Sequence, residues 1–182
     1  MKPRSFDVIV LGAGAAGLFC AIEAGRRGRS VLVIDHASAP GEKIRISGGG
    51  RCNFTNTFAS PANYLSANRH FCVSALKRFT AADFIARVDA QGIAWHEKTL
   101  GQLFCDGSAK QIVDMLTGDL AEAGGKLELS TEVEEISQTA GGYDIRLSSG
   151  PVICASLVIA TGGKSIPKMG ASGFAYRVAG QF

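Results

Sequence analysis

An apolar run of strand length leads directly into glycines at fixed spacing near the start of the chain. Residues 6–11 precede these glycines, and a helix-like stretch over residues 18–27 follows them. This order of strand, turn and helix is the context of a dinucleotide-binding turn, in which successive glycines permit the turn, the approach of a pyrophosphate and close helix packing. The predicted phosphate-binding residues are Gly12, Gly14, Ala15, Ala16 and Gly17.

A second apolar strand strengthens this prediction. Residues 30–34 read as a buried parallel strand that ends in Asp35, with His36 after it. Asp35 follows the first glycine by the roughly 20 residues typical of a carboxylate that binds an adenosine ribose. Residues 6–35 are therefore predicted to form a βαβ nucleotide-binding unit, with Asp35 and His36 beside the cofactor. The alternative is an α/β domain without a nucleotide, in which Asp35 only ends a strand.

Composition and charge are those of a globular domain. The 182 residues are 46% hydrophobic and 19% charged, and the formal net charge is only +3. Basic residues are dispersed, except for a cluster at residues 26–29 that the dipole at a helix C-terminus explains. We therefore expect a small-molecule substrate and no nucleic-acid partner.

The cysteines indicate neither a metal centre nor a disulfide framework. The five cysteines are far apart and contain no C-x-x-C pair, so we expect no metal, no redox partner near Cys52 and a reducing compartment. Lys2 and Arg4 precede an apolar stretch that resembles a signal peptide, but Asp7 interrupts it and no run has the ~18 apolar residues of a membrane span. A cytoplasmic protein without membrane contact is expected.

A long polar stretch over residues 40–61 follows the βαβ unit. It is too long for an ordinary connection in a compact domain, which favours a role in binding. Successive glycines can present backbone N–H groups to a phosphate, and an arginine beside them adds a fixed positive charge. The candidate cofactor residues of this loop are Lys43, Ser47, Gly48, Gly49, Gly50, Arg51, Cys52 and Asn53.

The rest of the chain indicates the subclass of nucleotide-binding fold. A helical segment is expected over residues 70–124, an antiparallel β-meander over 126–154 and a second glycine turn over 160–173. A meander that leads into a parallel strand is typical of flavin-binding domains and favours flavin over nicotinamide as the tightly held cofactor. The predicted fold is α/β, a single Rossmann-like domain with a parallel sheet and a meander crossover. The candidate cofactor residues of the second turn are Ala160, Thr161, Gly162 and Gly163.

Three sequence blocks resemble one bacterial family. They are GGGRCNFTN at 48–56, ATGGKSIP at 160–167 and GASG at 170–173. Together they resemble the BaiN-like NAD(P)/FAD-dependent oxidoreductases, also called aminoacetone-oxidase-family flavoproteins. Gly101-Gln102 and Phe104-Cys105 depart from the glycine-arginine and phenylalanine-proline pairs usual in that family.

The resemblance implies a cofactor and a reaction class. FAD would lie along the two glycine turns, Val133 would meet the adenine, and NAD(P)H would supply hydride for an unsaturated or carbonyl acceptor. His36, His70 and His96 are acid-base candidates by residue type only, so the catalytic residue is unknown. Family members also continue through a substrate domain and a flavin-closing segment, so the chain is expected to be an N-terminal portion. A nicotinamide-binding domain without flavin and a non-catalytic fragment are the alternatives.

Overall fold

The computed structural model describes residues 2–163 and 173–182, which form two compact units. Unit 1 comprises Met1–Lys43 and Leu116–Phe182, and unit 2 comprises Ile44–Met115. The sequence predicts a single domain. Its pattern of apolar residues contains no signal that marks a boundary between the two units. Residues 164–172 of the predicted second glycine turn lie outside the described residues. Each unit is described by itself.

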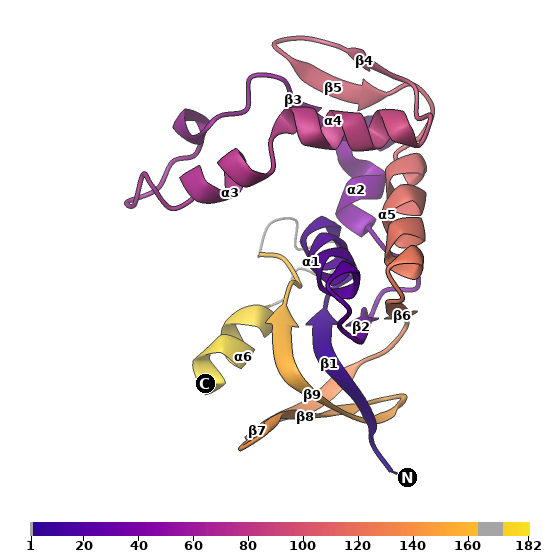
Figure 1. The fold of residues 1–182 in the computed structure, drawn as a ribbon, viewed down its shortest axis with the longest axis vertical. Coiled ribbons are helices and arrows are strands. Elements are labelled where there is room, and N and C mark those ends of the chain that lie inside the picture. Colours follow the sequence, from indigo (N-terminus) through magenta and orange to yellow (C-terminus); the bar gives the residue numbers. More distant parts are fainter. Residues whose placement is uncertain (1, 164–172) are drawn as a thin grey trace. The chain divides into compact units, whose positions relative to one another are not determined.

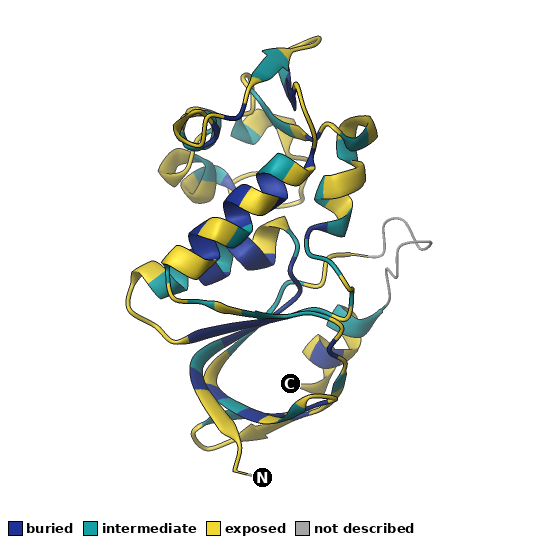
Figure 2. Ribbon diagram, turned by 90° about the vertical axis from the view of Figure 1, so that its right-hand side faces the viewer, coloured by how far each residue is buried: buried dark blue, intermediate teal, exposed yellow. Residues whose placement is uncertain are grey.

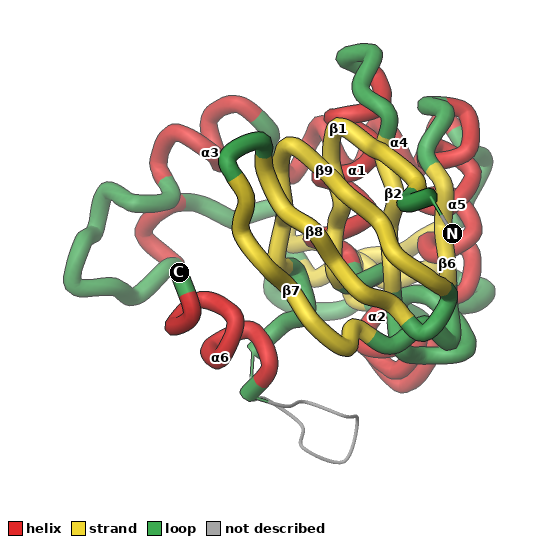
Figure 3. The backbone as a smooth tube through the Cα atoms, turned by 90° about the horizontal axis from the view of Figure 1, so that it is seen from below, coloured by secondary structure: helices red, strands yellow, loops and turns green. Residues whose placement is uncertain are grey.

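Unit 1 is built on a six-stranded mixed sheet with the order β6-β2-β1-β9-β8-β7 (Figure 3). β6, β2, β1 and β9 pair in parallel, whereas β8 pairs antiparallel with both β9 and β7. This arrangement confirms the predicted Rossmann-like fold with a meander. The strands are β1 (Arg4–Leu11), β2 (Val31–Ile34), β6 (Lys126–Glu128), β7 (Val133–Thr139), β8 (Gly142–Leu147) and β9 (Gly150–Ile159).

The central strands are apolar because they are covered on both faces. All four residues of β2 are buried, and so are Ile9, Val10 and Leu11 at the end of β1. Helix α1 (Ala15–Arg26) buries Gly17, Leu18, Ala21 and Ile22, and buried residues also run through the strands of the sheet (Figure 2). A Cβ atom at Gly25 would lie 2.6 Å from the carbonyl oxygen of Ala123, so this glycine permits close packing of α1 against the chain that follows α5 (Lys110–Glu122). Helix α6 (Phe174–Gln181) buries its central valine, Val178, in the core cluster of the sheet.

The meander differs from the prediction at both of its ends. The sequence predicts that residues 126–130 begin the meander, but β6 pairs in parallel with β2 at the edge of the sheet. The meander is predicted to end at residue 154, but its last strand, β9, continues to Ile159 and runs from the meander into the parallel sheet beside β1. The antiparallel part therefore begins at β7, because α5 returns the chain to the open edge of β2 first.

Unit 2 contains a three-stranded antiparallel sheet with the order β3-β5-β4 (Figure 1). Two of its strands interrupt the segment 70–124 that the sequence predicts to be helical. The Thr80 side chain accepts a hydrogen bond from the Asp83 N–H and so caps the start of the helix over Ala81–Ala90. The elements are α2 (Glu42–Ile46), η1 (Ser47–Gly50), β3 (Asn53–Asn56), η2 (Pro61–Asn63), α3 (Val73–Arg78), α4 (Ala81–Ala90), β4 (Trp95–Glu97) and β5 (Gln102–Cys105).

Candidate functional site: a nucleotide pocket in unit 1

The first glycine turn has the geometry expected at the start of a nucleotide-binding helix. Gly12 has a φ of +109°, and its N–H donates to the Ile34 carbonyl at 2.7 Å. A Cβ atom at Gly12 would lie 2.5 Å from the Ala160 carbonyl oxygen, and one at Gly17 would lie 1.9 Å from the Gly12 carbonyl oxygen. These two glycines are therefore required for the close approach of β1, α1 and the end of β9.

Gly14 differs from its two neighbours in the motif. Apart from its chain neighbours, no heavy atom of the described residues would lie within 4 Å of a Cβ atom there, and Gly14 is the N-cap of α1 without a side-chain hydrogen bond to the helix. The first turn of α1, which contains Ala15 and Ala16, has no acidic residue. Backbone N–H groups at a helix start have no partner within the helix, and the helix dipole favours an anion there. Gly14 thus leaves space beside an electropositive end of α1.

Asp35 ties the second strand to this turn. Its two carboxylate oxygens accept hydrogen bonds from the Ala13 N–H at 2.7 Å and from the Ala37 N–H at 2.9 Å. The Nδ1 atom of His36 lies 3.3 Å from one of the same oxygens, and the His36 side chain is exposed. The Asp35 side chain is only 16% exposed, so most of its hydrogen-bonding capacity is directed at these backbone groups.

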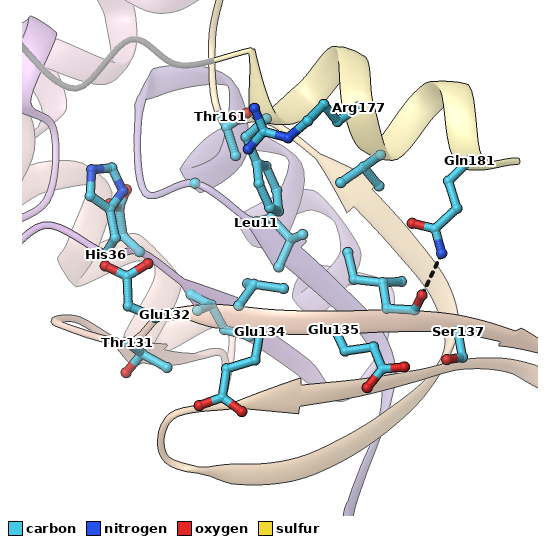
Figure 4. A pocket seen from close by; sticks show the side chains of 17 residues that line it. Leu11, His36, Thr131, Glu132, Glu134, Glu135, Ser137, Thr161, Arg177 and Gln181 are labelled. Carbon is cyan, nitrogen blue, oxygen red and sulfur yellow. Dashed lines mark hydrogen bonds and ion pairs between the residues drawn. The ribbon is translucent and has the colours of Figure 1, made fainter.

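A cavity of about 800 Å³ opens beside these residues (Figure 4). Its floor is apolar and includes Leu11, Ile34 and Ile136, whereas its rim carries acidic and hydroxyl groups from the segment that leads into β7. An apolar cavity with a few polar groups at its edge is typical of small-molecule and cofactor sites. The predicted site residues that line it are Gly12, Asp35, His36, Val133 and Thr161.

Helix α6 closes one side of this cavity, which the sequence did not predict. The guanidinium of Arg177 lies 5.9 Å from the ring centre of Phe174, and both side chains line the pocket. The Gln181 side chain donates to the Ile136 carbonyl at 2.7 Å and so fixes α6 to β7. The amphipathic pattern of residues 174–181 indicates a helix with one buried face, but it does not indicate which face of the sheet that helix covers.

The second glycine turn and Lys43 lie close together within unit 1. A Cβ atom at Gly162 would lie 3.4 Å from the Lys43 Nζ atom, and the Ala160 N–H donates to the Leu11 carbonyl at 2.8 Å. The cation of Lys43 and the second turn are therefore neighbours, as a shared role beside an anionic cofactor requires.

The glycine-rich loop with Ser47, Arg51, Cys52 and Asn53 belongs to unit 2. Gly48, Gly49 and Gly50 all have positive φ angles, of +58°, +68° and +88°. A Cβ atom at Gly48 would lie 2.5 Å from the Phe104 ring, so the loop depends on glycine both for its backbone and for its packing. The Cys52 N–H donates to the Ser47 carbonyl at 3.0 Å, which closes the loop on itself.

The expectation that Cys52 has no second cysteine near it is wrong. Asn53 pairs with Phe104 across β3 and β5, which makes Cys52 and Cys105 neighbours across the two strands. The Cys105 N–H donates to the Arg51 carbonyl at 2.9 Å at the same point. Burial, followed by the nearby Cys52 thiol, raises the pKa of Cys105 to about 11, and burial also raises the pKa of Cys52. Both groups are therefore neutral thiols near pH 7.

The other two histidines do not line this pocket. The Nδ1 atom of His96 lies 2.6 Å from an Asp106 oxygen at the surface of unit 2, and the His70 ring accepts a hydrogen bond from Arg69. Among residues 2–163 and 173–182, no cluster of three His, Cys, Asp or Glu side chains could hold a metal ion. No helix in these same ranges is long and apolar enough to cross a membrane.

The fold and the glycine turns define a Rossmann-type unit of the kind found in FAD-binding proteins. The chain belongs to the family described as the HI0933-like protein Rossmann domain, whose model matches residues 6–182. It is similar to "Ribosomal RNA dihydrouridine synthase" of Escherichia coli K12, with 55% identity over 97% of this chain and 44% of the relative. The protein of the same name from Haemophilus influenzae is 48% identical over 96% of this chain and 44% of the relative. The chain thus spans less than half the length of these curated relatives.

More distant relatives share the family or the fold. The "3-dehydro-bile acid delta(4,6)-reductase" of Clostridium scindens is 26% identical over 93% of this chain and 42% of its own length. The solved 3-ketosteroid-delta4-(5alpha)-dehydrogenase of Rhodococcus jostii RHA1 has a TM-score of 0.63 at 18% identity, over 90% of this chain and 49% of that protein. The expected membership of a Rossmann-type family of FAD-binding oxidoreductases is confirmed. The narrower resemblance to BaiN-like reductases is not confirmed. Identity is 55% and 48% to the two ribosomal RNA enzymes, but only 26% to the bile acid reductase.

Proposed function

We propose that the chain is the FAD-binding, N-terminal part of a flavin-dependent reductase that converts uridine in ribosomal RNA to dihydrouridine. The observation that supports this most is the 55% identity to an enzyme of that name, which extends over almost the whole of this chain. The proposal replaces the expectation of a small-molecule substrate without nucleic acid. That expectation rested on a small net charge, which describes only this chain and not the longer relatives.

The residues of unit 1 fit an adenosine diphosphate group. The free space at Gly14 and the uncapped start of α1 suit a pyrophosphate, since a larger side chain would occupy this space. The Asp35 carboxylate and the apolar floor beside Val133 suit the ribose and the adenine. We assign the pyrophosphate to Gly14, Ala15 and Ala16, and the ribose to Asp35. Lys43 and Gly162 would border the cofactor further along.

The proposed chemistry is addition of hydrogen across one carbon-carbon double bond. Dihydrouridine differs from uridine by two hydrogens across the ring bond next to a carbonyl group, so the acceptor is an unsaturated carbonyl compound of the predicted class. FAD supplies hydride transfer when it is bound, NAD(P)H is the proposed donor of that hydride, and the second hydrogen would be a proton taken up from solution. The residues of this chain bind the cofactor, orient it and exclude water from its adenosine half.

The test is cofactor identity followed by activity of the complete gene product. The purified protein is expected to release FAD and not FMN on denaturation, identified by mass, because the site is built for adenosine diphosphate. NADH or NADPH is then expected to bleach the flavin absorbance near about 450 nm without oxygen. Ribosomal RNA from cells without the gene should lack dihydrouridine, which the gene should restore. Release of FMN alone, or dihydrouridine unchanged by the deletion, would contradict the proposal.

A further inference from the structure

The charges of the chain are distributed unevenly along the sequence. Residues 43–82 contain no Asp or Glu, so all sixteen acidic residues lie outside this stretch. The stretch includes the glycine-rich loop and then residues 57–79, which we call the basic-aromatic segment. The cations of the basic-aromatic segment are Arg69, Lys77 and Arg78, with His70 beside them. A partner of this segment therefore meets positive charge without acidic neighbours in the sequence.

The same segment exposes large apolar side chains. Phe58 is 71% exposed, Phe71 59% and Tyr64 45%, and Leu65 is almost fully exposed. Aromatic side chains are usually buried in a hydrophobic core, and a group of exposed ones is typical of an interaction surface. Most of the exposed large hydrophobic residues of the described chain lie between residues 46 and 79.

No carboxylate of the described residues forms an ion pair with the three cations of the segment. Among the ion pairs of the described residues none includes Arg69, Lys77 or Arg78, whereas Lys110 of the same unit pairs with Asp114 at 2.7 Å. The backbone of the segment is nevertheless ordered by local hydrogen bonds. Ser60 and Asn63 form a capping box at η2, and the Phe71 N–H donates to the Asn68 carbonyl at 3.1 Å. The side chains are thus displayed on a defined backbone.

We propose that the basic-aromatic segment binds unpaired regions of the substrate RNA. This inference rests on the proposed function, which makes RNA the substrate. Exposed aromatic rings interleaved with unpaired cations are the two components of single-strand recognition, since bases stack on rings and phosphates attract Lys and Arg. A purely apolar protein partner would match the rings but not the cations. RNA matches both, because each nucleotide carries a flat base and a negative charge.

The test measures RNA affinity apart from catalysis. The complete gene product and its Phe58→Ala/Phe71→Ala variant are titrated against a fluorescent oligouridylate of about 20 nucleotides, with fluorescence anisotropy as the readout. Loss of two stacking rings is expected to weaken binding about tenfold or more. A Lys77→Ala/Arg78→Ala variant should also lower the slope of log affinity against log salt by about 1.4, since two phosphate contacts are lost.

Matched controls come from exposed residues outside the segment. Leu100→Ala removes an apolar side chain that is 85% exposed, and Arg27→Ala removes an exposed cation of unit 1. Both controls should bind RNA like the unchanged protein. Circular dichroism and flavin content are measured for every variant, so that loss of folding is separated from loss of RNA binding.

The outcomes separate this inference from the proposed function. If both double variants bind RNA and form dihydrouridine as the unchanged protein does, the segment is not the RNA surface and the proposed function stands. If the unchanged protein binds RNA through these residues but forms no dihydrouridine, the surface stands and the proposed reaction fails. If the unchanged protein does not bind RNA, the proposed RNA-binding role of the segment is wrong. Association of the segment with another protein would then explain its exposed rings.

Discussion

The carboxylate of Asp35 accepts a hydrogen bond of 2.7 Å from the backbone N–H of Ala13, inside the first glycine turn. Its other oxygen holds the Ala37 N–H at 2.9 Å, so one side chain fixes the end of β2 to the turn that follows β1. The residue proposed to bind ribose therefore also shapes the proposed phosphate site. We therefore expect folding and ligand binding to be coupled through this carboxylate.

Asp35→Asn should weaken both folding and cofactor retention. An amide keeps one acceptor oxygen, so either Ala13 or Ala37 loses its partner, at a cost of about 1–3 kcal/mol in the free energy of unfolding. Urea unfolding and flavin content measure the two effects. Asp144→Asn, at an exposed carboxylate in β8, is the control and should change neither. Unchanged stability of Asp35→Asn would mean that the two hydrogen bonds contribute little.

Gly14→Val should abolish FAD retention in a folded protein. The described residues leave open space at this Cβ position, so the added side chain should meet the proposed pyrophosphate and not the protein core. Circular dichroism and flavin absorbance are recorded together. The matched control is Gly118→Val, at another glycine with open space, which should keep FAD. Normal flavin content in Gly14→Val would place the phosphate elsewhere.

Gly17→Ala should destabilise the fold itself, whereas Gly14→Val should affect cofactor retention in a folded protein. A single methyl group there would lie 1.9 Å from the Gly12 carbonyl oxygen, so the turn must open before the helix can pack. We expect loss of the folded state, seen as a lower melting temperature or as insoluble protein, before any specific loss of FAD. A stable Gly17→Ala protein would show that α1 can shift away from β1.

The buried thiols should make the protein sensitive to alkali. The pKa of Cys105 is about 11 in the folded protein against 9.0 for an ordinary thiol, so the unfolded chain loses this proton first. The contribution to stability is therefore present below pH 9 and is lost as the pH rises toward about 11. Urea unfolding over this range should show a smaller decline for Cys105→Ala than for the unchanged protein. An equal decline would assign the sensitivity to other groups.

Arg51→Ala and Cys52→Ser test the glycine-rich loop. Arg51 is exposed and can offer a forked, charged donor to a phosphate, so its loss should weaken FAD retention several-fold. Cys52→Ser should leave the anaerobic rate of flavin reduction mostly unchanged, because a neutral buried thiol is a poor nucleophile. The reverse pattern would add thiol chemistry to the mechanism, with Cys105 as the neighbouring group.

The sequence predicts best what local chemistry determines. The glycine spacing and the alternation of strand and helix in residues 6–35 each depend on a few neighbouring residues, and the nucleotide-binding fold follows from them. The pattern of residues 126–154 likewise indicates strands correctly. It does not tell that β6 pairs with β2, because the partner is far away in the sequence.

The incorrect predictions also involve residues that are far apart in the sequence. Cys52 and Cys105 are isolated in the sequence and become neighbours only through the antiparallel pairing of β3 and β5. The contribution of α6 to the pocket also depends on which face of the sheet this helix covers. Of the candidate site residues, those at strand ends are the easiest to predict, because a glycine turn or a carboxylate there has a fixed relation to its own strand.

The pairing of β1 with β9 has a consequence for biosynthesis. Leu11 is made at the start of the chain, whereas its partner Ile159 is made near the end of the described sheet. At about 5–20 residues per second, roughly 7 to 30 seconds separate the two on the ribosome. One apolar edge of β1 must stay unpaired for that time, and Thr161 and α6 complete the pocket later still. The nascent chain should therefore acquire its nucleotide only after nearly all of these 182 residues have emerged.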